Sequence, residues 1–272
     1  MNKANKTDIK VNKKYCSFCD NTGIITNPYY LELGDEPLSP CPKCVLVNCS
    51  CNGNSPYYCY TNNSINECSC REIRLKIERI NSIYSRSGID KKYRWKFINN
   101  FESTNKKVEE AKSIAYDIIT KFPDVKKGLF LWGNPGSGKT MLSAIILTEL
   151  ITRHAINGSL IKISRNFFNR LRSSFVEGSP NYGEATNIER EYAEIDILVV
   201  DDFGVQRDSP WEQETLYNLI DARYEAEKFT VFTSNNDPYK TLKEKADGRI
   251  LSRLKEMCRI IEISGDDYRE KL

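Results

Sequence analysis

Residues 133–140, GNPGSGKT, fit the phosphate-loop pattern GxxxxGK[ST] at every position. In this pattern the glycines let backbone N–H groups turn toward phosphates, and the start of the following helix adds partial positive charge. Lys139 is expected to reach the β- and γ-phosphates of ATP, and the Thr140 hydroxyl to ligate Mg²⁺. The competing interpretation is a glycine-rich turn without a ligand. The residues predicted to bind the nucleotide are Gly133, Asn134, Pro135, Gly136, Ser137, Gly138, Lys139, Thr140 and Met141.

Two carboxylates, Asp201 and Asp202, end an apolar run that begins at Ile197. Ligand sites of parallel sheets lie outside the carboxyl ends of the strands, so Asp201 is expected to hold Mg²⁺ through water. Asp202 is expected to orient or activate the attacking water. Many ATPases of this kind carry Glu there, and the shorter Asp predicts slow turnover. The alternative interpretation is a solvated acidic turn.

Further polar residues follow the next strands. Asn235 is predicted to sense the nucleotide, although an Asn-rich turn before Pro238 would have the same composition. Arg249 and Arg253 stand four residues apart on one face of a short predicted helix. A guanidinium can stabilise charge on a transferring phosphoryl group, in cis or from a neighbouring subunit. Arg269 follows the last predicted strand and is a candidate for contact with the nucleotide in cis. Taken alone, the three arginines are equally well explained as surface residues.

Cysteines dominate the N-terminal part, where nine of the ten lie between Cys16 and Cys70. In a chain with a nucleotide motif and no secretory signal, the expected compartment is the reducing cytoplasm, where clustered CxxC pairs indicate a metal more often than disulfides. Each pair can offer two thiolates to tetrahedral Zn²⁺, and nine thiols exceed one site, so one or two ions are expected. Free thiols or a redox role are the alternative. The candidate ligands are Cys16, Cys19, Cys41, Cys44, Cys68 and Cys70, with Cys49, Cys51 and Cys59 between them, while Cys258 and His154 are expected to be structural.

Apolar runs and amphipathic stretches alternate after residue 104, and they define the elements that must position these residues. Strands are predicted at 129–132, 160–163, 197–201, 229–233 and 259–263. Helices are predicted from 103 or 104 to 122, and at 140–154, 166–175, 211–227, 240–246 and 250–255. This alternation predicts an α/β fold with a parallel sheet and helices on both faces.

The composition sets the domain plan of the 272-residue chain. Residues 1–14 are expected to form a flexible basic tail, 15–70 a zinc module, 71–104 a basic amphipathic helix with a linker, and 105–272 the ATPase domain. A net charge of +3 permits a nucleic-acid partner but does not argue for one. We find no run of 18 apolar residues, so no membrane span is expected.

Six motifs in this order, GNPGSGKT, ILVVDDFG, WEQETLYNLIDARY, FTSNN, GRILSRL and DDYR, give the chain a resemblance over about residues 89–272. It resembles the DnaC/DnaI-type replicative helicase loaders, AAA+ ATPases related to the initiator DnaA and the transposition ATPase IstB. The resemblance implies that Asn235 is the sensor, Arg253 the trans-acting finger with Arg249 as its rival, and Arg269 the second sensor. It also implies an AAA+ domain without a C-terminal lid, because the sequence ends three residues after Arg269.

The resemblance also bears on DNA and zinc. In initiator-like ATPases the region corresponding to Arg165, Arg170 and Arg172 contacts single-stranded DNA, and interleaved Phe167, Phe168 and Phe175 would stack bases. A solvated basic helix face is the alternative. For zinc, the loader-like pattern CxxC-DTG followed by CxC favours the set Cys16, Cys19, Cys68 and Cys70, which competes with the set Cys16, Cys19, Cys41 and Cys44.

The function implied is an ATP-dependent loader that brings a hexameric replicative helicase onto single-stranded DNA and acts as a homo-oligomer. In such loaders the N-terminal module grips the helicase, although zinc modules often touch DNA instead. Two other functions stay open: an IstB-like transposition ATPase on duplex DNA, and a non-hydrolysing, ATP-gated zinc adaptor. A small-molecule kinase would leave the Asn and Arg motifs without a role.

Overall fold

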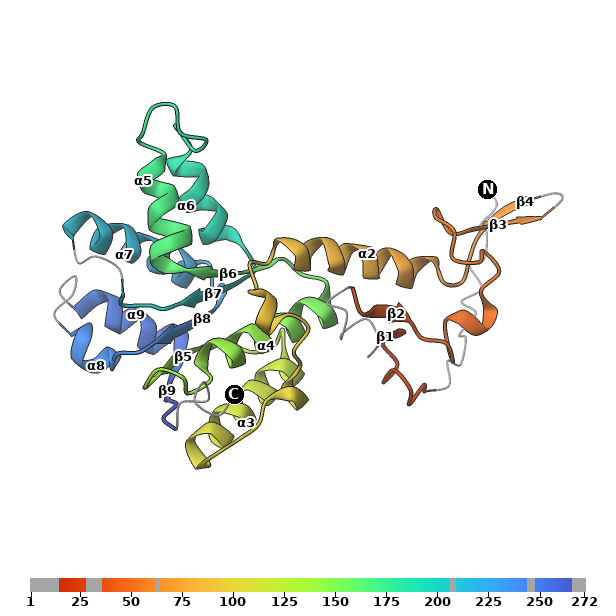
Figure 1. The fold of residues 1–272 in the computed structure, drawn as a ribbon, viewed down its shortest axis with the longest axis horizontal. Helices are drawn as coiled ribbons and strands as arrows, with labels where there is room; N and C mark the ends of the chain where they lie inside the picture. The colour runs from red at the N-terminus through yellow and green to blue at the C-terminus, as the bar shows by residue number, and fades with distance from the viewer. Residues whose placement is uncertain (1–14, 28–35, 62–63, 206–208, 244–247, 266–272) are drawn as a thin grey trace, which may run out of the picture. The chain divides into compact units, whose positions relative to one another are not determined.

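The computed structural model describes residues 15–27, 36–61, 64–205, 209–243 and 248–265. The chain divides into two compact units, Met1–Glu78 and Arg79–Leu272 (Figure 1). Within the described residues, every helix falls short of the length and apolar character that a membrane crossing requires.

The first unit contains two small antiparallel pairs of strands. Strand β1 (Ile24–Thr26) pairs with β2 (Leu38–Pro40), and β3 (Tyr58–Thr61) pairs with β4 (Ser64–Glu67). A short 3-10 turn, η1, covers Leu46–Asn48. Cysteine sulfurs make up most of the buried core, which consists of Cys19, Cys41, Val45, Cys51, Tyr57, Cys68 and Cys70. Because so little aliphatic surface is buried, this unit needs another source of stability.

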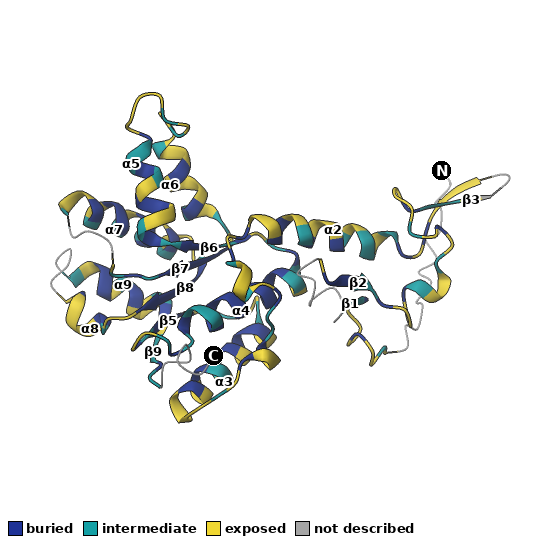
Figure 2. Cartoon of the chain, viewed as in Figure 1, coloured by how far each residue is buried: buried dark blue, intermediate teal, exposed yellow. Residues whose placement is uncertain are grey.

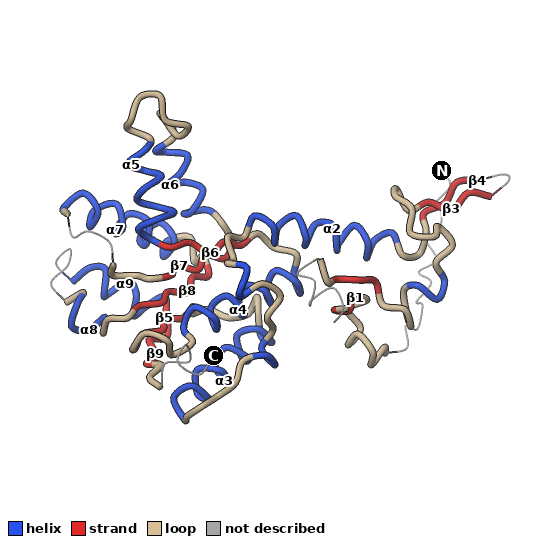
Figure 3. The backbone as a smooth tube through the Cα atoms, viewed as in Figure 1, coloured by secondary structure: helices blue, strands red, loops and turns tan. Residues whose placement is uncertain are grey.

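The second unit is built on a five-stranded parallel sheet with the order β6-β7-β8-β5-β9 (Figure 3). The strands are β5 (Gly128–Trp132), β6 (Gly158–Lys162), β7 (Ile197–Asp201), β8 (Phe229–Ser234) and β9 (Cys258–Glu262). Strands β7 and β8 are buried along their whole length (Figure 2). The predicted parallel sheet is confirmed, with each strand end within two residues of its predicted place.

Helices cover both faces of this sheet, as predicted. The helix α4 packs on β6, β7 and β8 together with α3, while α5, α6, α7 and α9 share a core with the opposite face. The helices and turns are α2 (Arg71–Arg86), η2 (Lys91–Tyr93), η3 (Ile98–Asn100), α3 (Lys106–Lys121), α4 (Lys139–His154), η4 (Ile163–Phe168), α5 (Asn169–Ser173), α6 (Ala185–Glu194), α7 (Pro210–Glu225), α8 (Pro238–Thr241) and α9 (Arg249–Met257).

The helix predictions need correction at four places. The helix predicted at 166–175 is a π-helical turn, η4, followed by the short α5. Helix α6 was not predicted, because only two of its side chains, Ile188 and Tyr192, are buried in a ten-residue segment that is otherwise mostly polar. Helix α3 begins two or three residues later than predicted, because the Asn105 side chain accepts a hydrogen bond from the Val108 N–H and so caps it. For the helix predicted at 240–246, α8 ends at Thr241 and residues 244–247 lie outside the described part.

Residues 79–101, the first part of the second unit, pack on helix α4. The Tyr84 and Trp95 rings stack with centroids 3.8 Å apart, and the Tyr84 hydroxyl lies 3.3 Å from the Thr148 hydroxyl on α4. The Ile98 N–H donates to Glu149 Oε1, also on α4, at 3.1 Å. These contacts hold the segment before α3 against the helix that starts at the phosphate loop.

A buried arginine joins α6, α7 and β8. Arg223 is 1% exposed and donates to the carbonyl oxygens of Tyr192, Ala193, Ile195 and Phe229 and to the Thr230 hydroxyl. Burial lowers the pKa of its guanidinium to about 9. These donors satisfy carbonyl groups at the end of α6, just after it and at the start of β8.

Replacement of Arg223 by Met is expected to lower the free energy of unfolding by about 3 kcal/mol or more, because several buried acceptors lose their donor together. Urea denaturation of the variant measures the change. The control is Arg190→Met on the exposed face of α6, where the change should stay below about 0.5 kcal/mol. An equal, small loss in both variants would contradict the role of Arg223.

Candidate nucleotide site and cysteine clusters

The phosphate loop connects β5 to α4, as the motif requires. Gly138 is the N-cap of α4 with φ of 91°, and Gly136 has φ of 76°, which are left-handed conformations that glycine adopts without strain. Two further glycines, Gly128 and Gly133, stand at the two ends of β5. A Cβ on Gly128 would lie 1.8 Å from the Thr230 carbonyl oxygen, and one on Gly133 would lie 2.0 Å from that of Ile263. The loop is therefore held by close backbone contacts with β8 and with the end of β9.

Lys139 is the first residue of α4, and its side chain folds back over the loop. Its Nζ donates to the carbonyl oxygens of Gly133 at 2.9 Å and Asn134 at 2.8 Å. The ammonium group is thus placed within the concavity that the loop encloses, where phosphate oxygens can replace carbonyl oxygens as acceptors.

The carboxylate of Asp201 joins the loop to the sheet. Its Oδ1 accepts hydrogen bonds from the Thr140 hydroxyl at 2.8 Å and from the Thr233 hydroxyl at 2.6 Å. The structure thus brings together the two residues that the sequence predicts as Mg²⁺ ligands. Asp201 is 2% exposed, and burial raises the pKa of its carboxyl, while the two hydroxyl donors act in the opposite direction. Two oxygens at this spacing, one of them carboxylate, are suitable ligands for Mg²⁺ or for its bound water.

Thr233 is a site residue that the sequence analysis missed. Its hydroxyl donates to Asp201 and also accepts the N–H of Asp202 at 3.1 Å. Asp202 itself has φ of 58°, a left-handed backbone conformation, directly after β7. A buried hydroxyl at the carboxyl end of β8, next to an acidic strand end, is the signal that could have identified Thr233.

Replacement of Thr233 by Val should reduce ATP turnover by about 10- to 100-fold, because both acidic residues lose the hydroxyl that orients them. The effect should fall on kcat more than on KM, since no phosphate contact is removed. Thr152→Val on α4, where the hydroxyl bonds only to carbonyl groups of its own helix, is the matched control. Unchanged kcat in Thr233→Val would exclude this positioning role.

The other predicted polar residues lie in different surroundings. Asn235 is exposed and follows β8 in a bend, and among the described contacts none joins its side chain to Asp201. Arg253 on α9 pairs with Asp221 Oδ1 on α7 at 2.7 Å, and Arg249 lies over the Tyr217 ring at 4.7 Å. Both arginines thus contact α7 within the chain. Arg269 lies outside the described residues.

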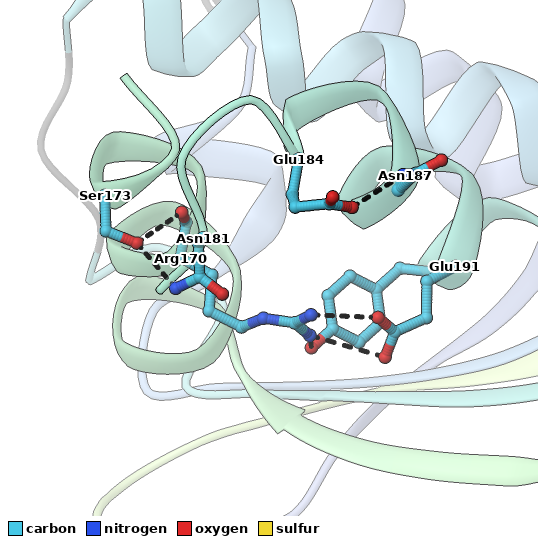
Figure 4. A network of polar contacts seen from close by, with 7 residues as sticks. Arg170, Ser173, Asn181, Glu184, Asn187 and Glu191 are labelled. Carbon is cyan, nitrogen blue, oxygen red and sulfur yellow. Dashed lines mark hydrogen bonds and ion pairs between the residues drawn. The ribbon is translucent and has the colours of Figure 1, made fainter. Parts of the chain in front are cut away.

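The arginines considered for DNA lie around η4 and α5. Arg165 is exposed. Figure 4 shows Arg170 paired with Glu191. Their closest nitrogen and oxygen are 3.0 Å apart, and Arg170 also donates to the Tyr192 hydroxyl. Arg172 pairs with the buried Glu212. Two of the three guanidinium groups therefore have carboxylate partners within the chain.

The aromatic side chains beside these arginines divide into two kinds. Phe167 and Phe168 are fully buried in the core, so the expectation that they stack on bases is wrong. Phe175 is 65% exposed and packs edge-on against Trp211 with ring centroids 6.4 Å apart. Only Phe175 of the three is accessible to a ligand.

The two CxxC pairs of the first unit converge. Cys16 Sγ lies 3.9 Å from Cys41 Sγ, Cys19 Sγ lies 3.5 Å from Cys44 Sγ, and all four atoms lie within 4.8 Å of one another. The Gly23 N–H donates to Cys19 Sγ at 3.3 Å. Four sulfurs at these distances can hold one tetrahedral metal ion of the Zn²⁺ type.

The competing ligand set needs correction. Cys68 and Cys70 do not join Cys16 and Cys19; they lie with Cys49 and Cys51 in a second group whose sulfurs are also within 4.8 Å of one another. The loader-like spacing suggested the wrong partners for Cys68 and Cys70. Cys49 and Cys51, which the sequence analysis left without a role, are the cysteines that lie next to them. Cys258 is buried in the second unit, as predicted.

Comparisons with known proteins cover most of the second unit. A model of the family described as IstB-like ATP binding protein matches residues 78–272. The chain is 29% identical over 193 residues to the uncharacterized protein YdaV of Escherichia coli (strain K12), covering 68% of this chain and 73% of that protein. It is 26% identical over 200 residues to the replicative helicase loader DnaC of Buchnera aphidicola subsp. Baizongia pistaciae, covering 72% and 78%. The crystal structure of the DnaC helicase loader matches with a TM-score of 0.56 at 25% identity, over 64% of this chain and 100% of that one.

Proposed function

Because the chain belongs to the family of IstB-like ATP-binding proteins, we propose that it is an ATPase that loads a replicative DNA helicase onto single-stranded DNA. The observation that carries this proposal is the contact of Thr140 with Asp201 behind a complete phosphate loop, in a chain similar to the loader DnaC over 200 residues. The protein would act in the cytoplasm as a homo-oligomer.

The site residues would divide the work of hydrolysis. The loop N–H groups and Lys139 bind the phosphates of ATP, and Thr140 with Asp201 would hold Mg²⁺, which neutralises phosphate charge when bound. Asp202 orients the attacking water and accepts its proton. Asn235 contacts the γ-phosphate side of the site and so senses its state.

Arginines would complete the site. Arg253 enters the site of a neighbouring subunit as the finger, with Arg249 as the alternative, and Arg269 contacts nucleotide in cis. Support for this arrangement comes from the resemblance to helicase loaders, in which the corresponding arginines have these roles.

The first unit, which contains the two cysteine groups, would bind the helicase. We assign one structural Zn²⁺ to Cys16, Cys19, Cys41 and Cys44, on the strength of their sulfur distances. A unit with little aliphatic core gains its stability from such an ion. Single-stranded DNA would bind at the second unit through Arg165, with Arg170 and Arg172 exchanging their carboxylate partners for phosphates.

ATP hydrolysis by the full chain, with and without single-stranded DNA and the hexameric helicase of the same replicon, tests the proposal. We expect slow basal turnover that single-stranded DNA and helicase increase, and co-elution of chain and helicase on size exclusion. If the chain binds no hexameric helicase, the loader proposal fails. Preference for duplex DNA would favour a transposition-type ATPase, and ATP binding without phosphate release would favour a gated adaptor.

A further inference from the structure

A second group of four cysteines lies in the first unit, distinct from the Cys16 group. Its members come from two identical Cys-Ser-Cys segments, residues 49–51 and 68–70. The distance from Cys70 Sγ is 3.5 Å to Cys49 Sγ, 3.4 Å to Cys51 Sγ and 3.6 Å to Cys68 Sγ. Cys49 Sγ lies 3.7 Å from Cys51 Sγ and 3.9 Å from Cys68 Sγ.

These distances fit a metal centre and do not fit disulfides. A Zn–S bond of about 2.3 Å gives the edge of a tetrahedron a length of about 3.8 Å, close to all five sulfur distances. A disulfide would bring two sulfurs to about 2.05 Å. The group is also shielded from solvent, since Cys51, Cys68 and Cys70 are buried and Cys49 is partly buried.

The fold of the unit explains why these segments meet. The hairpin of β3 and β4 pairs Tyr58 with Glu67, and its ladder continues when the Cys68 N–H donates to the Tyr57 carbonyl oxygen at 3.0 Å. The hairpin therefore returns the second Cys-Ser-Cys segment to the first. Helix α2 begins directly after it, at Arg71.

A positively charged side chain, that of Arg74, lies beside the second cysteine group. Arg74 Nε donates to Cys70 Sγ at 3.3 Å, and the Arg74 N–H donates to the Cys70 carbonyl oxygen at 3.0 Å in the first turn of α2. The Arg74 guanidinium also lies over the Tyr57 ring, 5.4 Å from its centroid. An arginine fixed in this way offsets part of the negative charge that four thiolates leave around one divalent ion.

We propose that Cys49, Cys51, Cys68 and Cys70 bind a second Zn²⁺ ion, which fastens the first turn of α2 to the segment 49–51. The four thiols lose their protons to solvent when the ion binds. Sulfur-only tetrahedral coordination suits Zn²⁺ or iron, and we commit to Zn²⁺ because it needs no redox partner. The proposal depends neither on ATP hydrolysis nor on the helicase.

Zinc content per chain, measured by plasma mass spectrometry on the full chain purified under reducing conditions without chelator, tests the proposal. The expected count is two ions. The variant Cys51→Ser/Cys70→Ser should retain one, and so should Cys19→Ser/Cys44→Ser, which removes the other site. The matched control is Cys59→Ser, whose sulfur lies by Ser50 Oγ outside both groups and whose zinc count should stay at two.

The count in the unmodified chain needs no variant to fold, and a count of one overturns the proposal. Iron instead of zinc, or a disulfide between the two Cys-Ser-Cys segments under reducing conditions, overturns it as well. Two ions retained in Cys51→Ser/Cys70→Ser would assign the second ion elsewhere and would also reject it. Replacement of zinc by Co²⁺ adds a direct check, because thiolate-to-metal absorption should be twice as strong in the unmodified chain as in either double variant.

Discussion

Lys139→Ala is expected to weaken ATP binding by about 10- to 100-fold and to abolish measurable turnover. The ammonium group of Lys139 lies over the loop, 2.9 Å and 2.8 Å from two loop carbonyl oxygens, so it is already placed for phosphate oxygens. A charge-assisted hydrogen bond contributes about 1.5–3 kcal/mol, and every 1.4 kcal/mol corresponds to about tenfold in affinity. Loss of phosphate charge neutralisation in the transition state adds to this effect.

Equilibrium binding of a fluorescent ATP analogue and phosphate release together measure this change. Lys126→Ala, an exposed lysine just before β5, is the control and should leave both quantities unchanged. Thermal unfolding without nucleotide shows whether the variant folds. If folded Lys139→Ala bound ATP with nearly the affinity of the unmodified chain, the loop would not be the nucleotide site.

Arg253→Ala is expected to keep ATP binding and to lose about 10³-fold or more in turnover, because a finger arginine acts on the charge of the transition state. In the isolated chain this guanidinium pairs with Asp221 and lies over the Tyr224 ring at 4.5 Å. It therefore stands on the α7–α9 side of the unit. Arg249→Ala on the same helix is the matched comparison. If this variant loses turnover and Arg253→Ala does not, Arg249 is the finger.

Mixing variants decides whether the arginine acts in trans. Asp202→Asn keeps Arg253 but lacks the group that orients water, whereas Arg253→Ala has an intact phosphate loop. Each variant alone should be inactive, and the mixture should recover turnover if one subunit completes the site of the next. A mixture as inactive as its components, while both variants still assemble, would contradict a trans-acting finger.

The second unit could be predicted closely because its signals are strong and local. Each apolar run of β5, β7 and β8 is bounded by charged, glycine or turn residues, and the motif order led to the resemblance with AAA+ helicase loaders. The comparisons confirm that resemblance. The contact of Thr140 with Asp201 follows from the same rule, since residues at the carboxyl ends of parallel strands meet at one edge.

Other features could not be predicted because they depend on contacts distant in sequence. Thr233 is an ordinary strand residue until β7 and β8 lie side by side, and α6 buries only two side chains in a short, mostly polar segment. The grouping of the cysteines depends on the β3–β4 hairpin, whose alternation is weak because β4 is exposed along its length. The pairing of Arg170 and Arg172 with Glu191 and Glu212 likewise depends on tertiary structure.

The two glycines that bound β5 limit how this part of the chain can vary in evolution and in engineering. A side chain at either position would overlap a carbonyl oxygen of a neighbouring segment, so neither end of the strand tolerates a larger residue. An insertion or deletion of a single residue in β5 would move a bulky neighbour into one of these positions and displace the phosphate loop by about 3.3 Å along the strand. The length of this strand is therefore as restricted as the loop motif itself, and homologous chains that differ in length should differ elsewhere.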